Sequence, residues 1–212
     1  MKPLIVANWK CNPGTLGEAQ RLFDSIKSVQ KAEVVICPPF VYLSALKATG
    51  SQDVFWEDGG AYTGEISPSM LKNMGVRYVI VGHSERRKYL KETNEMIDRK
   101  TKAAVVQGLR PILCIDKISQ IPGDLSNEAI IAYEPLFAIG TGKACSLDRA
   151  RKMRLAIERS TSGKNPILYG GSVNAQNARE YVSEAGFQGL LVGGASLRPG
   201  EFVDIIKNVC YC

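Results

Sequence analysis

Residues 129–143 read Ala129-Ile130-Ile131-Ala132-Tyr133-Glu134-Pro135-Leu136-Phe137-Ala138-Ile139-Gly140-Thr141-Gly142-Lys143. The apolar run up to Tyr133 predicts a buried strand, so Glu134 stands at the carboxyl end of that strand, and Pro135 stiffens the turn. The apolar residues after it lead into Gly-Thr-Gly, which predicts a loop that hinges at its glycines and covers the carboxylate, excluding water. The alternative, an ordinary strand, turn and helix cap, fits this stretch about equally well.

Strand-like runs alternate with helical patterns on both sides of this stretch. The expected strands are 4–8, 33–37, 52–55, 77–82, 111–115, 129–133, 167–169 and 189–192. The expected helices are 17–30, 41–48, 67–75 and 94–107, with others starting after Ser146, at Asn174 and near Pro199. Repeated βα units form parallel sheets, and eight strands favour a closed (β/α)₈ barrel. Counting alone leaves an open doubly wound sheet as the alternative.

The composition is that of a globular protein with one domain, residues 1–212. The chain is 45% hydrophobic and 23% charged, and its 212 residues suffice for a (β/α)₈ barrel at the lower end of that fold's size range. The apolar run near the N-terminus is too short for a signal peptide, and no stretch approaches the length of a membrane span. We therefore expect a cytoplasmic protein with no membrane partner.

The net charge of +6 allows for nucleic acid or for a small anionic substrate as a partner. The basic residues are scattered, with Arg86-Arg87-Lys88 as the densest cluster, so solvated helix faces are favoured and nucleic acid is not expected. The six cysteines form no Cys-x-x-Cys pair and no zinc-type spacing with the single histidine, so no metal site is predicted. Cys37 and Cys114 lie in apolar runs, which is typical of buried thiols in a reducing compartment.

Three of the expected strands are followed by residues with catalytic potential. Asn8 and Lys10 follow the first strand, His83 and Glu85 the fourth, and Glu134 the sixth. A histidine on an apolar strand is more often structural, and a lysine after a strand is usually solvated. In a closed parallel barrel, however, all these loops meet at one face, and the conjunction favours an active site.

Glycine pairs follow the last two expected strands, in Tyr169-Gly170-Gly171-Ser172-Val173 and Val192-Gly193-Gly194-Ala195-Ser196. Such turns let backbone N–H groups converge on an anion, and a following helix terminus adds its dipole. Each pair alone is commonly only a tight turn. Two pairs after the final strands match the place where barrel enzymes frequently bind phosphate.

Several stretches together resemble the triosephosphate isomerase family, over nearly the whole chain: 7–10, 60–66, 82–87, 132–143, 169–173 and 192–196. The resemblance implies a (β/α)₈ barrel, usually a homodimer. It also implies an isomerase that interconverts dihydroxyacetone phosphate and glyceraldehyde 3-phosphate through an enediolate, in glycolysis and gluconeogenesis, with no cofactor and no metal.

The resemblance also assigns roles to individual residues. Glu134 matches the base, His83 the electrophile toward the substrate oxygens, and Lys10 the cation that attracts the anionic substrate. Asn8 matches a further donor, and Glu85 a carboxylate that supports the lysine. The residues that match donors to the phosphate are Gly140, Ser172, Gly193 and Gly194.

The chain departs from the family's pattern in local ways. Where the family reads Cys-Ile-Gly-Glu and enters a substantial helix, Cys114-Ile115-Asp116-Lys117 precede a short link, residues 116–128, interrupted by Pro122-Gly123. We therefore expect the helix after the fifth strand to be missing or reduced to a short loop. The link 39–52 is also abbreviated, Phe137 replaces a common tryptophan, and Asp53 replaces a common asparagine.

The stretch from Trp56 to Ile66 resembles the family's projecting interface loop. This resemblance implies a homodimer in which Thr63 reaches toward Asn8 and Lys10 of the partner subunit, and surface exposed by a missing helix leaves a tetramer open. Two functions of other classes also stay open. A barrel that binds phosphate-bearing metabolites without efficient turnover is disfavoured by the intact set of polar residues, and a nucleic-acid-binding module is disfavoured by the scattered charge.

Overall fold

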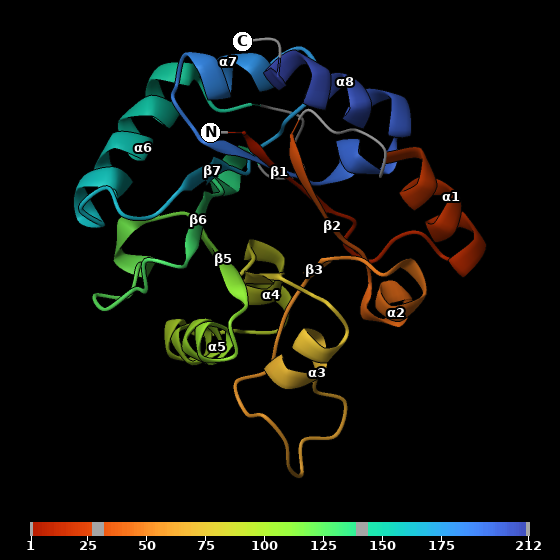
Figure 1. The fold of residues 1–212 in the computed structure, drawn as a ribbon. Helices are drawn as coiled ribbons and strands as arrows, with labels where there is room; N and C mark the ends of the chain where they lie inside the picture. The colour runs from red at the N-terminus through yellow and green to blue at the C-terminus, as the bar shows by residue number, and fades with distance from the viewer. Residues whose placement is uncertain (1, 27–31, 139–143, 211–212) are drawn as a thin grey trace.

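The computed structural model describes residues 2–26, 32–138 and 144–210. Its eight strands are β1 (Leu4–Asn8), β2 (Glu33–Cys37), β3 (Gly50–Ser51), β4 (Tyr78–Val81), β5 (Arg110–Ile115), β6 (Ile130–Tyr133), β7 (Ile167–Tyr169) and β8 (Gly189–Val192). They form one sheet in the order β2-β1-β8-β7-β6-β5-β4-β3, and every hydrogen-bonded pair is parallel. Figure 1 shows the strands at the centre and the helices around them.

The two ends of this strand order meet at Gly50 in β3. A Cβ atom on Gly50 would lie 2.5 Å from Sγ of Cys37 and 2.6 Å from Cγ1 of Val35, both in β2. Only a residue without a side chain fits so close to the neighbouring strand. The sheet therefore forms a nearly closed ring, and the predicted (β/α)₈ barrel is confirmed.

The helices surround the barrel. They are α1 (Leu16–Ile26), α2 (Leu43–Leu46), α3 (Pro68–Asn73), α4 (Ser84–Tyr89), α5 (Asn94–Val106), α6 (Leu147–Ser160), α7 (Ala178–Ser183) and α8 (Pro199–Cys210). The 3₁₀ turns are η1 (Phe40–Tyr42), η2 (Ile118–Gln120), η3 (Leu136–Ala138) and η4 (Gly194–Leu197). Hydroxyl caps start two of the helices, because Ser67 Oγ accepts from Met70 N and Thr93 Oγ1 accepts from Met96 N.

The segment between β5 and β6 holds the turn η2 and no α-helix, and all of its residues are described. The side-chain oxygen of Gln120 accepts hydrogen bonds from the N–H groups of Asp116 and Lys117, at 2.7 and 3.1 Å. Ile121 and Leu125 are partly buried and pack against the hydrophobic core. A short turn with two apolar side chains thus covers this part of the barrel.

Three expected elements differ from the structure. The expected strand 52–55 is replaced by β3 at Gly50–Ser51, because the close approach to β2 needs a glycine, a residue that ordinarily disfavours strands. Helix α4 forms where only a polar passage was expected, and it buries none of its residues, so it has no apolar periodicity. The helix expected from Asn174 begins at Ala178, because Asn174 Oδ1 accepts from two backbone N–H groups and forms a turn first.

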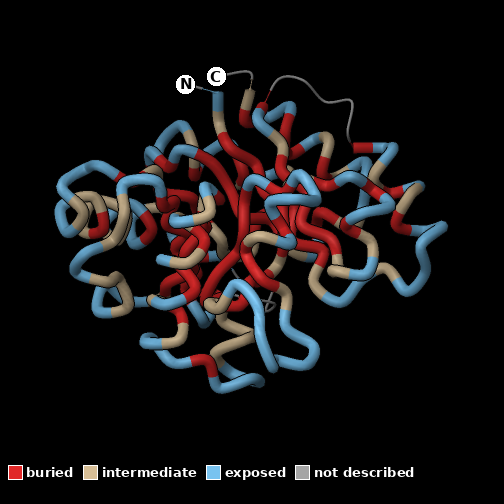
Figure 2. Tube along the Cα trace, turned by 60° about the horizontal axis from the view of Figure 1, so that its bottom comes forward, coloured by how far each residue is buried: buried red, intermediate tan, exposed pale blue. Residues whose placement is uncertain are grey.

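Alternate residues along each strand face opposite sides of the sheet. In β1, Leu4 and Val6 belong to the inner cluster of the barrel, whereas Ile5 and Ala7 pack in the larger cluster under the helices. Figure 2 shows the buried positions gathered along the central strands. Asn8 continues the inward series of β1, and Glu134 continues the inward series of β6, so both side chains are directed into the mouth of the barrel.

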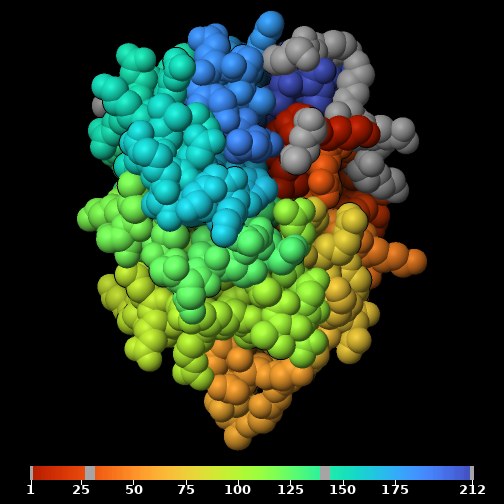
Figure 3. Space-filling model, turned by 60° about the vertical axis from the view of Figure 1, so that its left-hand side comes forward, coloured from red at the N-terminus to blue at the C-terminus, as the bar shows by residue number. Residues whose placement is uncertain are grey.

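The segment between β3 and α3 projects from the body of the molecule (Figures 1 and 3). Its base is closed by a backbone hydrogen bond from Phe55 N to Ile66 O at 2.8 Å. The ring of Phe55 lies against the rings of Trp56 and Tyr62, with centroids 4.3 and 4.8 Å away. These contacts give the projection an apolar base of its own. Among the described helices, none has the length and the apolar run needed to cross a membrane.

Candidate active site

A cavity of about 500 Å³ opens at the carboxyl ends of the strands. It is lined by Asn8, Lys10, His83 and Glu134, and by the turns after β7 and β8, which include Ser172, Gly193 and Gly194. The structure therefore brings together the candidate residues from five different strand ends. Glu85 joins them through Lys10, whereas Gly140 lies outside the described residues.

Lys10 is held at its backbone and at its ammonium group. Asn8 Oδ1 accepts a hydrogen bond from Lys10 N at 3.0 Å, which fixes the turn directly after β1. The ammonium Nζ lies 2.6 Å from Glu85 Oε1. Glu85 thus connects the loop after β1 with α4, and Lys10 places a cation at the rim of the cavity.

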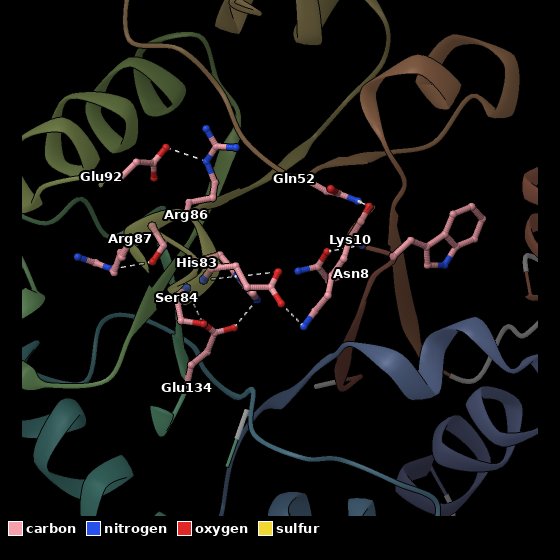
Figure 4. Close-up of polar contacts among 12 residues, drawn as sticks. Asn8, Lys10, Gln52, His83, Ser84, Arg86, Arg87, Glu92 and Glu134 are labelled. Carbon is pink, nitrogen blue, oxygen red and sulfur yellow. Dashed lines mark hydrogen bonds and ion pairs between the residues drawn. The ribbon is translucent and has the colours of Figure 1, made fainter. Parts of the chain in front are cut away.

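Glu134 is 2% exposed, and its carboxylate contacts His83 and the N–H group of Ser84. Oε1 lies 3.2 Å from His83 Nε2, and Oε2 accepts from Ser84 N at 3.3 Å (Figure 4). Burial alone raises the pKa of Glu134, but His83 and the Ser84 N–H outweigh burial and hold the pKa below its usual value. The residue is therefore a carboxylate at neutral pH, which is the form that a base requires.

His83 caps the N-terminus of α4. Its Nδ1 accepts a hydrogen bond from Glu85 N at 3.3 Å, so in the neutral ring the proton is on Nε2, the nitrogen that faces Glu134. Burial lowers the pKa of His83, but the nearby carboxylates of Glu134 and Glu85 raise it further than burial lowers it. The net pKa lies above its usual value, and the position of Glu134 determines this balance.

The glycine turns allow close packing against the polar residues. A Cβ atom on Gly170 would lie 2.9 Å from Cγ of Glu134, and one on Gly193 would lie 3.2 Å from Cε of Lys10. Ser172 Oγ donates a hydrogen bond to the carbonyl of Ala138, which links the turn after β7 to η3. These turns therefore lie directly beside both Glu134 and Lys10.

A cluster of four buried or partly buried charged side chains connects α4 with neighbouring elements. Lys100 Nζ lies 2.8 Å from Asp53 and 2.5 Å from Glu92, and Arg86 contacts the same two carboxylates at 2.8 and 2.7 Å. Burial raises the pKa of Asp53 to about 6, although Lys100 and Arg86 oppose that effect. The expectation that the cluster Arg86-Arg87-Lys88 is simply solvated is therefore wrong for Arg86, whose partners are buried.

Sequence analysis missed three residues that shape the site. Arg87 Nε donates to Gly82 O at 2.7 Å, and its Nη2 donates to Cys114 O at 3.3 Å. Asp116 Oδ1 accepts from Leu136 N at 3.0 Å, directly after the Glu134-Pro135 turn. Gln52 donates to the backbone carbonyls of Lys10 and Cys37. Asp116 and Arg87 carried a signal, since each lies in the passage after an expected strand, whereas Gln52 carried none.

Within the described residues, no group of three or more histidine, cysteine or acidic side chains is arranged to bind a metal ion. The fold and the site together define a (β/α)₈-barrel protein with acid–base residues and a cation around one cavity.

Comparison with known proteins identifies the family within this class of barrel proteins. The family model described as triosephosphate isomerase matches residues 3–209. A triosephosphate isomerase from Alkaliphilus oremlandii is 43% identical over 246 residues, covering 97% of this chain and 99% of the relative. Similar relatives of that name come from Thermoanaerobacter sp., 41% identical with the same coverage, and from Synechococcus sp., 40% identical over 98% of this chain and 95% of the relative.

The chain belongs to the triosephosphate isomerase family. The alignments are longer than the 212 residues of the chain, because the relatives carry internal residues that this chain lacks. This difference agrees with the short link between β5 and β6.

Proposed function

We propose that this protein is an active triose-phosphate isomerase that interconverts dihydroxyacetone phosphate and D-glyceraldehyde 3-phosphate in glycolysis and gluconeogenesis. The observation that carries the proposal is the buried carboxylate of Glu134, 3.2 Å from the imidazole of His83, in a cavity that Lys10 also lines. Family membership adds the substrate, since the relatives are named for it.

In the proposed reaction, Glu134 removes a proton from the carbon next to the carbonyl group. The electron pair of the broken C–H bond forms the C=C bond of an enediolate, and negative charge develops on the carbonyl oxygen. His83 Nε2–H, the Lys10 ammonium and the Asn8 amide are the donors available to that oxygen. His83 Nε2 donates its proton to the former carbonyl oxygen and takes up the proton of the neighbouring hydroxyl group, which becomes the new carbonyl. Glu134 then returns its proton to the neighbouring carbon, so that the overall charge and composition are unchanged.

His83 has to serve as a neutral donor in this reaction. In the present arrangement Glu134 raises the pKa of His83, and that contribution weakens when Glu134 turns toward the substrate. Burial of the ring then favours the neutral form, as does the N–H group of Glu85 at the start of α4, which needs an unprotonated Nδ1. When Glu134 turns toward the substrate, the pKa of His83 therefore falls, and His83 becomes the neutral donor that the reaction needs.

The phosphate group of the substrate has partners in the turns after β7 and β8. We assign it to Ser172, Gly193 and Gly194, with Gly140 as a further donor from outside the described residues. Leu136 and Phe137 lie directly after the base and are 55% and 44% exposed, so they are the apolar side chains available to cover a bound substrate. Covering the site excludes water, which strengthens the base and protects the enediolate.

The test is isomerase activity toward glyceraldehyde 3-phosphate in a coupled assay, for the wild type and for Glu134→Asp. Shortening the side chain by one methylene withdraws the carboxylate by more than 1 Å, and a misplacement of about 1 Å costs on the order of 100-fold in rate. We expect a strong wild-type rate and a fall in kcat of that order in the variant. A folded but inactive wild type that still binds 2-phosphoglycolate would instead favour a barrel that binds phosphate without turnover.

The same proposal includes a cytoplasmic homodimer built on the segment from Trp56 to Ile66, with Thr63 reaching the site of the partner subunit. It is supported by the projection of this segment (Figure 3) and by its exposed Tyr62. The buried cysteines Cys37, Cys114 and Cys145 are free thiols, which suits a reducing compartment. Sedimentation at several concentrations tests the assembly, and a mass that remains monomeric at every concentration would reject the dimer.

A further inference from the structure

Lys10 has a backbone conformation that is unusual for a lysine. Its φ angle is +54°, in the left-handed region that residues with a side chain rarely adopt. Within the described part of the chain, the other such residues are Lys47, Lys91 and Ser162, and none of them lines the cavity of the candidate site. A disfavoured conformation persists only where surrounding contacts hold it.

Side chains hold both polar groups of the Lys10 backbone. The N–H group donates to Asn8 Oδ1 at 3.0 Å, and the carbonyl accepts from Gln52 Nε2 at 2.9 Å (Figure 4). The same amide nitrogen of Gln52 donates its second hydrogen to the carbonyl of Cys37, also at 2.9 Å. Gln52 therefore joins the loop after β1 to the end of β2 with both of its donor hydrogens.

Gln52 occupies the junction where the barrel closes. It directly follows β3, and backbone pairing in the fully described strands joins β3 to β4 and β2 to β1. Across the remaining junction, β3 approaches β2 closely at Gly50, and the side chain of Gln52 then bridges to the carbonyl at the end of β2. The contact that ties this junction together is thus also the contact that fixes the Lys10 carbonyl.

We infer that Gln52 is a positioning residue that keeps Lys10 in its left-handed conformation and so directs the ammonium group into the substrate cavity. The inference rests on the proposed isomerase function. Gln52 contributes no atom to the reaction, because its two donor hydrogens are occupied by the two carbonyls.

The direction of the Lys10 side chain depends on the backbone conformation, because the side chain extends from the loop after β1 and passes next to Gly193. A Cβ atom on Gly193 would lie 3.2 Å from Lys10 Cε, and the ammonium group reaches Glu85 at 2.6 Å. Without the Gln52 contact, the backbone of Lys10 relaxes toward an ordinary φ angle, and the direction of Cβ changes with it. The Lys10 ammonium group then moves away from the part of the cavity that would hold the anionic substrate.

The test compares Gln52→Met, which keeps the length of the side chain but donates no hydrogen bond, with Gln52→Asn, which keeps the amide but is too short to bridge both carbonyls. Lys10 faces both the anionic substrate and the oxygen that gains charge, so its displacement affects KM and kcat together. We expect Gln52→Met to raise KM for glyceraldehyde 3-phosphate by about tenfold and to lower kcat by about tenfold. The dissociation constant of 2-phosphoglycolate, measured by calorimetry, should rise in parallel, and Gln52→Asn should lie between wild type and Gln52→Met.

Gln188→Met is the matched control. Gln188 also makes a partly buried structural bond, in which its Oε1 accepts from Ile167 N at 2.8 Å at the start of β7, away from the cavity. This variant should lose stability and retain the wild-type KM.

Two results would overturn the inference: Gln52 variants that keep the wild-type KM and dissociation constant, or a Gln188→Met variant with the same rise. An inactive wild type would reject the isomerase proposal alone, because 2-phosphoglycolate binding would still decide the role of Gln52.

Discussion

Replacement of Gly170 by alanine tests how closely the position of the base governs the reaction. Gly170 follows β7, and its N–H donates to Tyr133 O at 2.8 Å. An added Cβ atom would lie 2.9 Å from Cγ of Glu134 and 3.5 Å from Cβ of Leu191. Carbon atoms in contact prefer separations of about 3.5–4.0 Å, so Glu134 has to move by roughly 0.6–1.1 Å.

A shift of this size predicts a fall in kcat of between about tenfold and 100-fold, because a misplacement of about 1 Å costs on the order of 100-fold. We expect little change in KM, since Lys10, Ser172 and Gly193 keep their places. The backbone of Gly170 is not in the left-handed region, so alanine is tolerated there and the fold is retained.

The assay is isomerase kinetics in both directions, with thermal unfolding to verify the fold. Gly123→Ala is the matched control, because an added Cβ atom would meet no atom within 4 Å there and the backbone is again free of positive φ. A Gly170→Ala enzyme with kcat within about threefold of the wild type would refute the reasoning, because it would show that Glu134 can be displaced without loss of rate.

Two further predictions concern the buried charges under α4. Lys100→Met leaves Asp53 and Glu92 without their buried cation and should lower the free energy of unfolding by about 3–5 kcal/mol in urea titrations, whereas Lys102→Met, at an exposed lysine, should change it little. Because burial raises the pKa of Asp53 to about 6, the folded protein binds a proton there that the unfolded chain loses near pH 4. The contribution of Asp53 to the free energy of unfolding therefore falls as pH rises from about 4 to about 6, and Asp53→Asn should remove that fall. Equal pH slopes for wild type and Asp53→Asn would contradict it.

The positions of the candidate residues could be predicted because they depend on short-range patterns. The apolar runs that end at Asn8, Gly82 and Tyr133 mark strand ends, and a parallel barrel collects all strand ends of one kind at one face. The alternation along β1 and β6 then determines that Asn8 and Glu134 point inward. The grouping of the candidate residues at one face of the barrel therefore follows from local sequence and one topological rule, whereas their individual roles were assigned from the family resemblance.

The supports of the site could not be predicted in this way, because their roles depend on residues far apart in the chain. Lys100 lies in α5 and resembles a solvated lysine, yet it is buried where Asp53, 47 positions away, meets it. Gln52 has no pattern of its own, and its role appears only where β3 approaches β2. Buried polar residues of this kind are identified by their partners, and the sequence does not show which partners they have.

The short link after β5 lies away from most of the residues that form the candidate site. The residues around the cavity come from the ends of β1, β4, β6, β7 and β8, and β5 contributes none of them. In this link, Ile121 and Leu125 supply apolar cover, and Asn165 Nδ2 donates to the carbonyls of Ser126 and Ala129 at 2.9 and 2.8 Å. The link contacts the turn after Glu134 through Asp116, whose Oδ1 accepts from Leu136 N. The candidate site therefore forms without an α-helix at this position, and the turn supplies an acceptor for the residue that follows Glu134-Pro135.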